Sequence, residues 1–288
     1  MKLEKISKRR KIMHAKHFGK CALCGKLKEL TFEHIPPNKA FNFTPAKPIS
    51  GDSLLKAATD NNRLPWDHSG LKYLNQQQGM GLYSLCQSCN NLTGAWYGDS
   101  YVDLTKRIHY LLKKEIPLDY HEVEFVIKEI YPQRIIKQVV SMFCSINQRH
   151  YLDTRFLLLR EFVLDRDLVS LDKNKYKICM YLTRSNMCKY CGFTIKLGGK
   201  DMQHITAECM SEFCAYPLGF ILYFEPDEKR EFLGTDITHF SDYSYDEKVD
   251  FKISVPILEN NTWIPEDSRS KAEIIETISK TNGKEEGK

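Results

Sequence analysis

Two Cys-x-x-Cys pairs constrain this chain more than any other feature of its sequence. Cys21 and Cys24 form the first pair, Cys86 and Cys89 form the second, and the sequence predicts a turn at each pair. Four thiolates in a tetrahedron are the ligand set that structural zinc prefers. Neither pair lies in a βαβ pattern, so a thioredoxin-like redox pair is a poor alternative. We therefore predict one structural Zn²⁺ that ties two distant segments together.

The other cysteines and the hydropathy bear on the compartment. The 288-residue chain has ten cysteines and a net charge of +5. No apolar run approaches a membrane span, and the basic N-terminus lacks the apolar core of a signal peptide. In a reducing compartment, thiols bind metals or pack as small hydrophobic groups, and we expect Cys144 and Cys179 in the core. These features predict a cytoplasmic protein without a membrane partner.

Apolar periodicity divides the chain into expected elements. A short strand is expected at 30–35 and a polar, irregular insertion at 38–80, followed by a helix from Cys89 to about Lys114. Further helices are expected at 122–130, from Pro132 onward, and at 154–163. Strands are expected at 176–183, 193–197, 218–224 and 251–257, with a hairpin turn at Gly198-Gly199.

These elements predict an α+β fold with three parts. Residues 1–115 form a zinc-stabilised module with a basic N-terminal arm and the insertion 38–80. Residues 116–265 form a helical and then sheet-rich C-terminal domain, whose small sheet is mainly antiparallel. Residues 266–288 form a polar tail that is expected to be disordered.

A further motif lies between and after the cysteine pairs. Glu33-His34-Ile35 precedes Pro36 and Pro37, and Asn90 follows the second pair directly. In this order, the elements resemble the HNH (ββα-metal) endonuclease superfamily, in particular a bacterial branch with a four-cysteine structural zinc. The resemblance covers roughly the first third of the chain. It implies a zinc-stabilised ββα-metal module that hydrolyses phosphodiester bonds.

The resemblance also implies roles for individual residues. His34 would be the general base that activates water, and Glu33 and Asn90 would hold a catalytic divalent cation. Oxygen ligands favour Mg²⁺ or Mn²⁺ at such a site. Asn91 replaces Asn90 if the register slips by one. The middle Asn of the motif has no clear match, and Asn75 is the nearest candidate.

Several features allow a simpler interpretation. His34 taken alone is typical of a hydrogen-bonded histidine at a strand end. The segment from Met1 to Lys28 has ten basic residues and one acid, Glu4. Within it, one group of cations suits a phosphate backbone but also a solvated helix. Trp96 and Tyr97 either stack on bases or pack the module's helix. The basic group comprises Lys8, Arg9, Arg10 and Lys11.

A second cysteine group raises the same question. Cys188 and Cys191 form a zinc-knuckle spacing, and Cys209 and Cys214 follow with His204 nearby. The four thiols could bind a second zinc, but the segment lies among expected strands, where buried free cysteines are common.

The leading hypothesis is a metal-dependent HNH nuclease that cleaves DNA, most readily double-stranded DNA. Family analogy extends this hypothesis to a role in defence against foreign DNA. The C-terminal domain would recognise substrate, a protein partner or a regulator. One alternative is a catalytically inactive, zinc-stabilised nucleic-acid-binding module. Two departures from the family favour it: Glu33 stands where the family more often has Asp, and the middle Asn is missing. Another is an RNA-directed nuclease.

Overall fold

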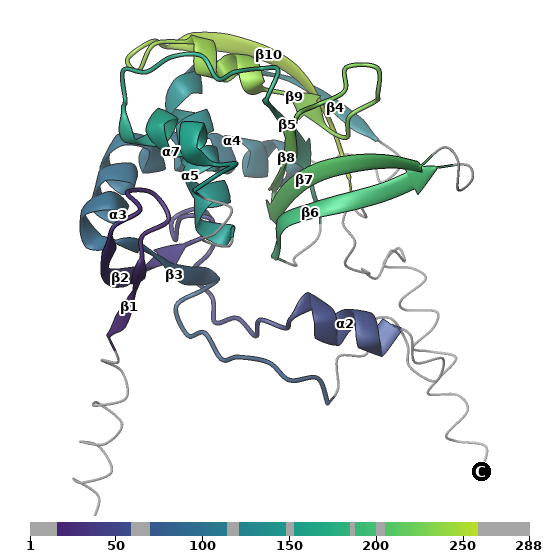
Figure 1. Ribbon diagram of the computed structural model, residues 1–288. Coiled ribbons are helices and arrows are strands. Elements are labelled where there is room, and N and C mark those ends of the chain that lie inside the picture. The colour runs from purple at the N-terminus through teal and green to yellow at the C-terminus, as the bar shows by residue number, and fades with distance from the viewer. Residues whose placement is uncertain are drawn as a thin grey trace, which may run out of the picture. The chain divides into compact units, whose positions relative to one another are not determined.

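The computed structural model describes residues 16–58, 70–113, 121–147, 153–184, 188–199 and 205–258 (Figure 1). The chain forms two compact units, one of Met1–Ala46 with Gln76–Leu258 and one of Lys47–Asn75 with Glu259–Lys288. The described residues combine helices with antiparallel sheets, as the predicted α+β class requires. The expected basic arm and polar tail lie outside the described residues.

A three-stranded sheet opens the first unit. Its strands are β1 (His17–Lys20), β2 (Leu27–His34) and β3 (Gly81–Cys86), with β2 in the centre and both pairings antiparallel. Helix α3 (Gln87–Thr93) follows β3 without a loop. The predicted strand at 30–35 is confirmed as part of β2, and the chain order β2, β3, α3 is two strands and a helix.

The second unit contains the only described part of the expected insertion that forms a helix, α2 (Gly51–Ala58). The two ends of segment 47–75 are joined by backbone pairing. Ile49 and Tyr73 form an antiparallel β-bridge, and the Leu74 N–H donates to the Pro48 carbonyl at 3.0 Å. The predicted 38–80 insertion therefore contains a segment that leaves the first unit and returns to it.

Four helical segments continue the first unit. A turn of π-helix, η1 (Gly94–Gly98), joins α3 to α4 (Asp99–Lys113), so the helix expected up to about Lys114 is confirmed. Pro132 begins α5 (Pro132–Ile146), as expected, because proline suits the first helical position. Almost the whole of α5 is buried. Helix α7 (Leu157–Leu164) confirms the helix expected at 154–163.

The helix predicted at 122–130 is wrong. These residues form strand β4 (Glu122–Ile130), paired antiparallel with β10 (Val249–Pro256). The side chains of Phe125 and Ile127 are buried, whereas Val126 between them is 56% exposed. This alternation has the two-residue period of a half-buried strand. The same apolar residues also suit a helical face over so short a segment, and pairing with β10 decides between the two.

The C-terminal part contains a five-stranded antiparallel sheet of order β6-β7-β8-β5-β9 (Figure 1). Expected strands are confirmed in β5, β6 and β8, whereas β7 and the short β9 were not expected. Gly198 and Gly199 pair with Thr206 and Ile205, so they end a strand and do not form the predicted turn. The strands are β5 (Tyr176–Leu182), β6 (Lys189–Gly199), β7 (Ile205–Ala215), β8 (Leu218–Phe224) and β9 (Thr235–Asp236).

Helix α5 connects the two main sheets of the first unit. It contacts β3, which precedes it in the chain, and β6 and β7, which follow it. It also contacts α4, α7 and the 3₁₀-helix η2 (Thr238–Asp242). One hydrophobic core therefore contains residues from the cysteine segment, such as Leu23, and from the five-stranded sheet, such as Phe220. Within the described ranges, no helix is long and apolar enough to cross a membrane.

A buried lysine ties α5 to the end of α7. The Lys137 ammonium is fully buried and donates to the carbonyls of Phe162, Asp165 and Leu168 at 2.8, 2.5 and 2.9 Å. The carbonyls at a helix C-terminus lack intrahelical donors and attract positive charge. Lys137 thus caps α7 from inside the core.

We expect Lys137→Met to lower the free energy of unfolding by roughly 2–4 kcal/mol, because three buried carbonyls lose their donor. Urea denaturation followed by tryptophan fluorescence measures this change. The matched control is Lys106→Met, at an exposed position of α4, where we expect less than about 0.5 kcal/mol. Equal midpoints for the two variants would contradict the capping role.

Candidate functional site

The four predicted zinc cysteines meet at one point. Cys21 and Cys24 lie in the turn between β1 and β2, Cys86 ends β3, and Cys89 lies in the first turn of α3. Their sulfur atoms all lie within 4.8 Å of one another, and the Cys24 and Cys86 sulfurs are 3.9 Å apart. Tetrahedral zinc with Zn–S bonds of about 2.3 Å separates its sulfurs by about 3.8 Å. This group of thiols fits one metal ion such as zinc.

Hydrogen bonds prepare these thiols for metal binding. The Cys86 N–H donates to the Cys21 sulfur at 3.3 Å, and the Ser88 hydroxyl lies 3.2 Å from the Cys86 sulfur. The hydrogen bond between the Cys89 and Cys21 sulfurs lowers the pKa of Cys21 to about 4 and raises that of Cys89, so the two sulfurs share one proton, which a bound metal ion would displace. Metal-bound cysteines are thiolates, so donors that stabilise the negative sulfur favour the bound state.

A buried arginine holds the cysteine turn in place. Arg160 of α7 donates from Nε to the Leu23 carbonyl at 2.6 Å and from its terminal nitrogen to Asp153 at 3.1 Å. Gly25 has φ of +70°, and a Cβ there would lie 2.3 Å from the guanidinium. Glycine at this position therefore serves both the left-handed turn and the close approach of Arg160.

The second cysteine group is not gathered in the described part of the chain. There, the first group is the one cluster of three or more potential metal ligands. Cys209 and Cys214 are five positions apart on β7, which places their side chains on opposite faces of the strand. Burial raises the pKa of Cys188 to about 12 and that of Cys214 to about 11. His204 lies outside the described residues.

His34 is the last residue of β2, and its ring is held in one orientation. Nε2 lies 2.8 Å from the backbone carbonyl oxygen of Gln78. A carbonyl oxygen only accepts hydrogen bonds, so the neutral ring must carry its proton on Nε2. The lone pair then resides on Nδ1. The half-buried imidazole thus has a fixed tautomer with an acceptor nitrogen, which is what a general base needs.

Asn90 contacts β2 from the helix side. Its side-chain nitrogen donates to the Thr31 hydroxyl at 3.0 Å and to the Phe32 carbonyl at 3.3 Å. Both amide protons are therefore directed at β2. The amide oxygen accepts no hydrogen bond from any residue that the structure describes, and it is available as a ligand.

Glu33 is a buried carboxyl group next to this contact. It is 6% exposed, and burial raises its pKa to about 8. Its carboxyl group makes no hydrogen bond or ion pair with the described residues. A buried carboxylate without a partner is costly, and a divalent cation would offset that cost. Glu33 and Asn90 each offer an oxygen atom, the ligand type that Mg²⁺ and Mn²⁺ prefer.

Asn42 is a residue that sequence reasoning missed. Its side-chain nitrogen donates to the carbonyls of Pro36 and Met80 at 2.6 and 2.7 Å, and its oxygen accepts from the Met80 N–H at 2.7 Å. It joins the chain leaving β2 to the chain entering β3. Nothing in the local sequence distinguishes Asn42 from the other asparagines of the predicted insertion.

The remaining predicted residues lie elsewhere. Asn91 is exposed, and Asn75 belongs to the other compact unit. Tyr97 is fully buried and donates to the Val163 carbonyl at 2.7 Å, and Trp96 packs against the core. These two aromatic residues therefore pack the helix, as one of the two interpretations expected. Lys8, Arg9, Arg10 and Lys11 lie outside the described residues.

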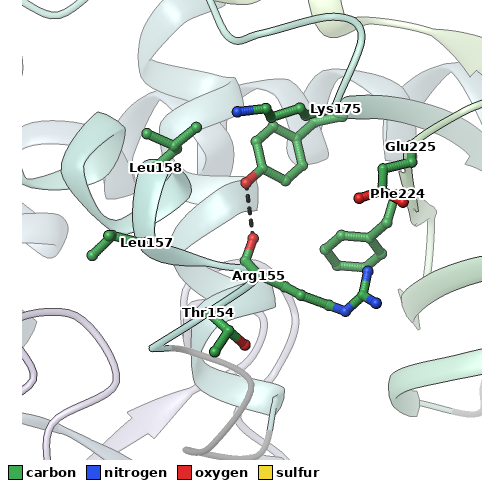
Figure 2. Close-up of a pocket in the computed structure, with 8 residues that line it drawn as sticks. Thr154, Arg155, Leu157, Leu158, Lys175, Phe224 and Glu225 are labelled. Atoms are coloured by element: carbon green, nitrogen blue, oxygen red, sulfur yellow. Dashed lines mark hydrogen bonds between the residues drawn. The ribbon is translucent and has the colours of Figure 1, made fainter.

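A hollow of about 650 Å³ lies apart from the predicted site residues, at the start of α7, the start of β5 and the end of β8 (Figure 2). Figure 2 shows the hydrogen bond that the Tyr176 hydroxyl donates to the Arg155 carbonyl at 2.8 Å. None of the residues predicted for catalysis or metal binding lines it. The lining comprises Thr154, Arg155, Leu157, Leu158, Lys175, Tyr176, Phe224 and Glu225.

Comparisons with protein-family models, with curated proteins and with solved structures find no match for this chain. The resemblance to the HNH superfamily therefore rests on the residues of the chain alone.

The four-thiol site makes a direct prediction about metal content. We expect the purified protein to hold one zinc per chain and Cys86→Ser to hold none, because three thiolates bind structural zinc poorly. Elemental analysis of the dialysed protein measures the stoichiometry. Cys179→Ala is the control, since Cys179 is a buried core thiol outside the cluster. One zinc per chain retained by Cys86→Ser would refute the assignment.

The buried Glu33 predicts a dependence of stability on pH. Between its ordinary pKa of 4.5 and the raised value of about 8, the folded state binds more protons than the unfolded state. The contribution of Glu33 to stability therefore falls as the pH rises through this window. Across this pH window, we expect the free energy of unfolding of Glu33→Gln to rise relative to that of wild type by on the order of a few kcal/mol.

Urea denaturation of both proteins across this pH window, without added divalent cation, measures the difference. Any effect of pH on the cysteine cluster is common to both proteins and cancels. Parallel stability profiles would show that the Glu33 carboxyl is not desolvated in the folded protein.

Proposed function

We propose that this protein is a metal-dependent endonuclease of the HNH type that hydrolyses phosphodiester bonds in DNA. The observation that carries the proposal is the state of His34 at the end of β2. The Gln78 carbonyl fixes the Nε2 proton and leaves Nδ1 as the acceptor. This orientation suits a base that removes a proton from water as the water attacks phosphorus.

The neighbouring residues support the same reaction. Glu33 and Asn90 would hold Mg²⁺ or Mn²⁺, which would stabilise negative charge on the phosphate and on the leaving oxygen. Asn90 is positioned by its bonds to Thr31 and Phe32, and Glu33 adjoins the second of these. The longer Glu side chain in place of the Asp common in this superfamily is compatible with the site, because the carboxyl group remains unpaired and buried.

Two other groups act through position. The four-cysteine site joins the start of β2 to the start of α3 and so sets the distance between His34 and Asn90. Asn42 joins the opposite ends of β2 and β3, and we assign it the positioning role of the middle asparagine in the HNH motif. Neither group contacts the reacting atoms in this proposal.

The test compares wild type with His34→Ala on supercoiled plasmid in Mg²⁺, in Mn²⁺ or in EDTA. We expect His34→Ala to lower the rate of nicking by about 10²–10⁴-fold, because the base is lost, and EDTA to abolish nicking. His121→Ala is the matched control, since His121 is exposed at the approach to β4. Equal nicking by wild type and His34→Ala would refute the role of His34.

The same samples separate the alternatives. A protein that binds DNA in a gel-shift assay but cleaves neither DNA nor RNA under any condition would be the inactive binding module. Cleavage of RNA alone would identify the RNA-directed nuclease. Asn90→Ala, measured over a range of Mn²⁺ concentrations, should need more metal for half-maximal activity, because one oxygen ligand is lost.

A further inference from the structure

We propose that the sheet face carrying His34 binds unpaired nucleotides of single-stranded DNA by stacking, so that the substrate is single-stranded or locally unwound at the site of cleavage. This inference rests on the proposed nuclease function. It concerns an aromatic stripe, which we define as His17, Tyr83 and Phe32 leading to His34.

The rings of the stripe form a continuous series across the three-stranded sheet. The His17 and Tyr83 rings are stacked with centroids 3.6 Å apart and an interplanar angle of 17°. Tyr83 meets Phe32 edge to face at 5.5 Å, and Phe32 meets His34 edge to face at 5.1 Å. The series begins on β1 and ends at the proposed general base.

The stripe is accessible, unlike the core tyrosines of η1 and α4. Tyr83 is 44% exposed, His17 is exposed, and Phe32 and His34 are half-buried. By contrast, Tyr97 and Tyr101 are no more than 1% exposed. A sheet face with several accessible rings is the arrangement that proteins use to stack unpaired bases.

Positive charge accompanies the rings. Lys28 is exposed and lies on the same face of β2 as Phe32 and His34, because side chains an even number of residues apart share a face. In the described part of the chain, Lys26 and Lys28 form no ion pair, whereas Lys20 pairs with Asp153. Cations beside a row of rings match a nucleic-acid strand, whose phosphates follow its bases.

The rings favour a single strand over a duplex. In a duplex, each base face is covered by its neighbours, so a side-chain ring gains little without unstacking them. An unpaired strand offers those faces directly. A base stacked on this stripe would bring an adjacent phosphate toward His34, where the proposed hydrolysis takes place.

The test measures the binding of a fluorescein-labelled single-stranded oligonucleotide and of its duplex by anisotropy, without added divalent cation so that no cleavage occurs. We expect wild type to bind the single strand more tightly. Tyr83→Ala should weaken binding of the single strand by about 5- to 100-fold, the range of one lost base–ring stack, and leave duplex binding nearly unchanged.

Three further variants make the test specific. Tyr110→Ala removes a tyrosine that is 69% exposed on α4, and we expect no change. Tyr83→Trp should retain binding because it keeps a ring, and His17→Ala should weaken binding even if Tyr83→Ala fails to fold. Lys28→Ala should lower the dependence of log K on log salt by about 0.7, as for one phosphate contact.

Each outcome has a defined meaning. Equal affinity of wild type and Tyr83→Ala for the single strand would overturn the stripe, as would an equal loss for duplex and single strand, or no binding at all. If only the catalytic proposal is wrong, nicking is absent or independent of His34 while Tyr83→Ala still weakens binding of the single strand. If only the stripe is wrong, nicking depends on His34 while Tyr83→Ala binds the single strand like wild type.

Discussion

The antiparallel register of β2 against β3 is the constraint on which the candidate site depends. It pairs Leu30 with Cys86 near the cysteine cluster and His34 with Gly81 at the other end. A slip of one residue would exchange the faces of Glu33 and His34. At one end the register is secured by the four thiols, and at the other by Asn42. Gly81 enforces it sterically, because a Cβ there would lie 2.2 Å from the Glu33 carbonyl oxygen.

The rest of the first unit packs against this pair of strands. Helix α5 contacts β3 and also β6 and β7, and the cysteine turn shares its hydrophobic core with the five-stranded sheet. Arg160 extends that support to the cysteine cluster, because it bonds the Leu23 carbonyl between Cys21 and Cys24. A four-thiolate zinc site carries net negative charge, which a neighbouring guanidinium offsets. The helical and sheet-rich part is thus a scaffold for the site as well as a candidate surface for recognition.

The sequence predicted what depends on spacing and local pattern. The cysteine pairs, the strand ending at His34, and α5 with its proline start are all of this kind. Residues whose role depends on distant partners were not predictable. The apolar residues of β4 suit a helix or a strand until β10 is placed beside them, and β7 mixes charged and apolar residues too evenly to show its pairing. Asn42 acts only because the chain returns at Met80, after a second compact unit has intervened.

The geometry of β2 restricts where the proposed hydrolysis would occur. Glu33 and His34 are adjacent, so their side chains leave the strand on opposite faces. Glu33 lies on the side that α3 covers, where Asn90 bonds Thr31, whereas His34 lies with Phe32 on the aromatic side. A phosphate that meets both residues must therefore sit at the end of the strand. Gly81 pairs with His34 at this end and presents no side chain to a ligand. The proposed site would consequently be an edge site, reached across the aromatic face, and a flexible unpaired strand would follow that path more easily than a rigid duplex.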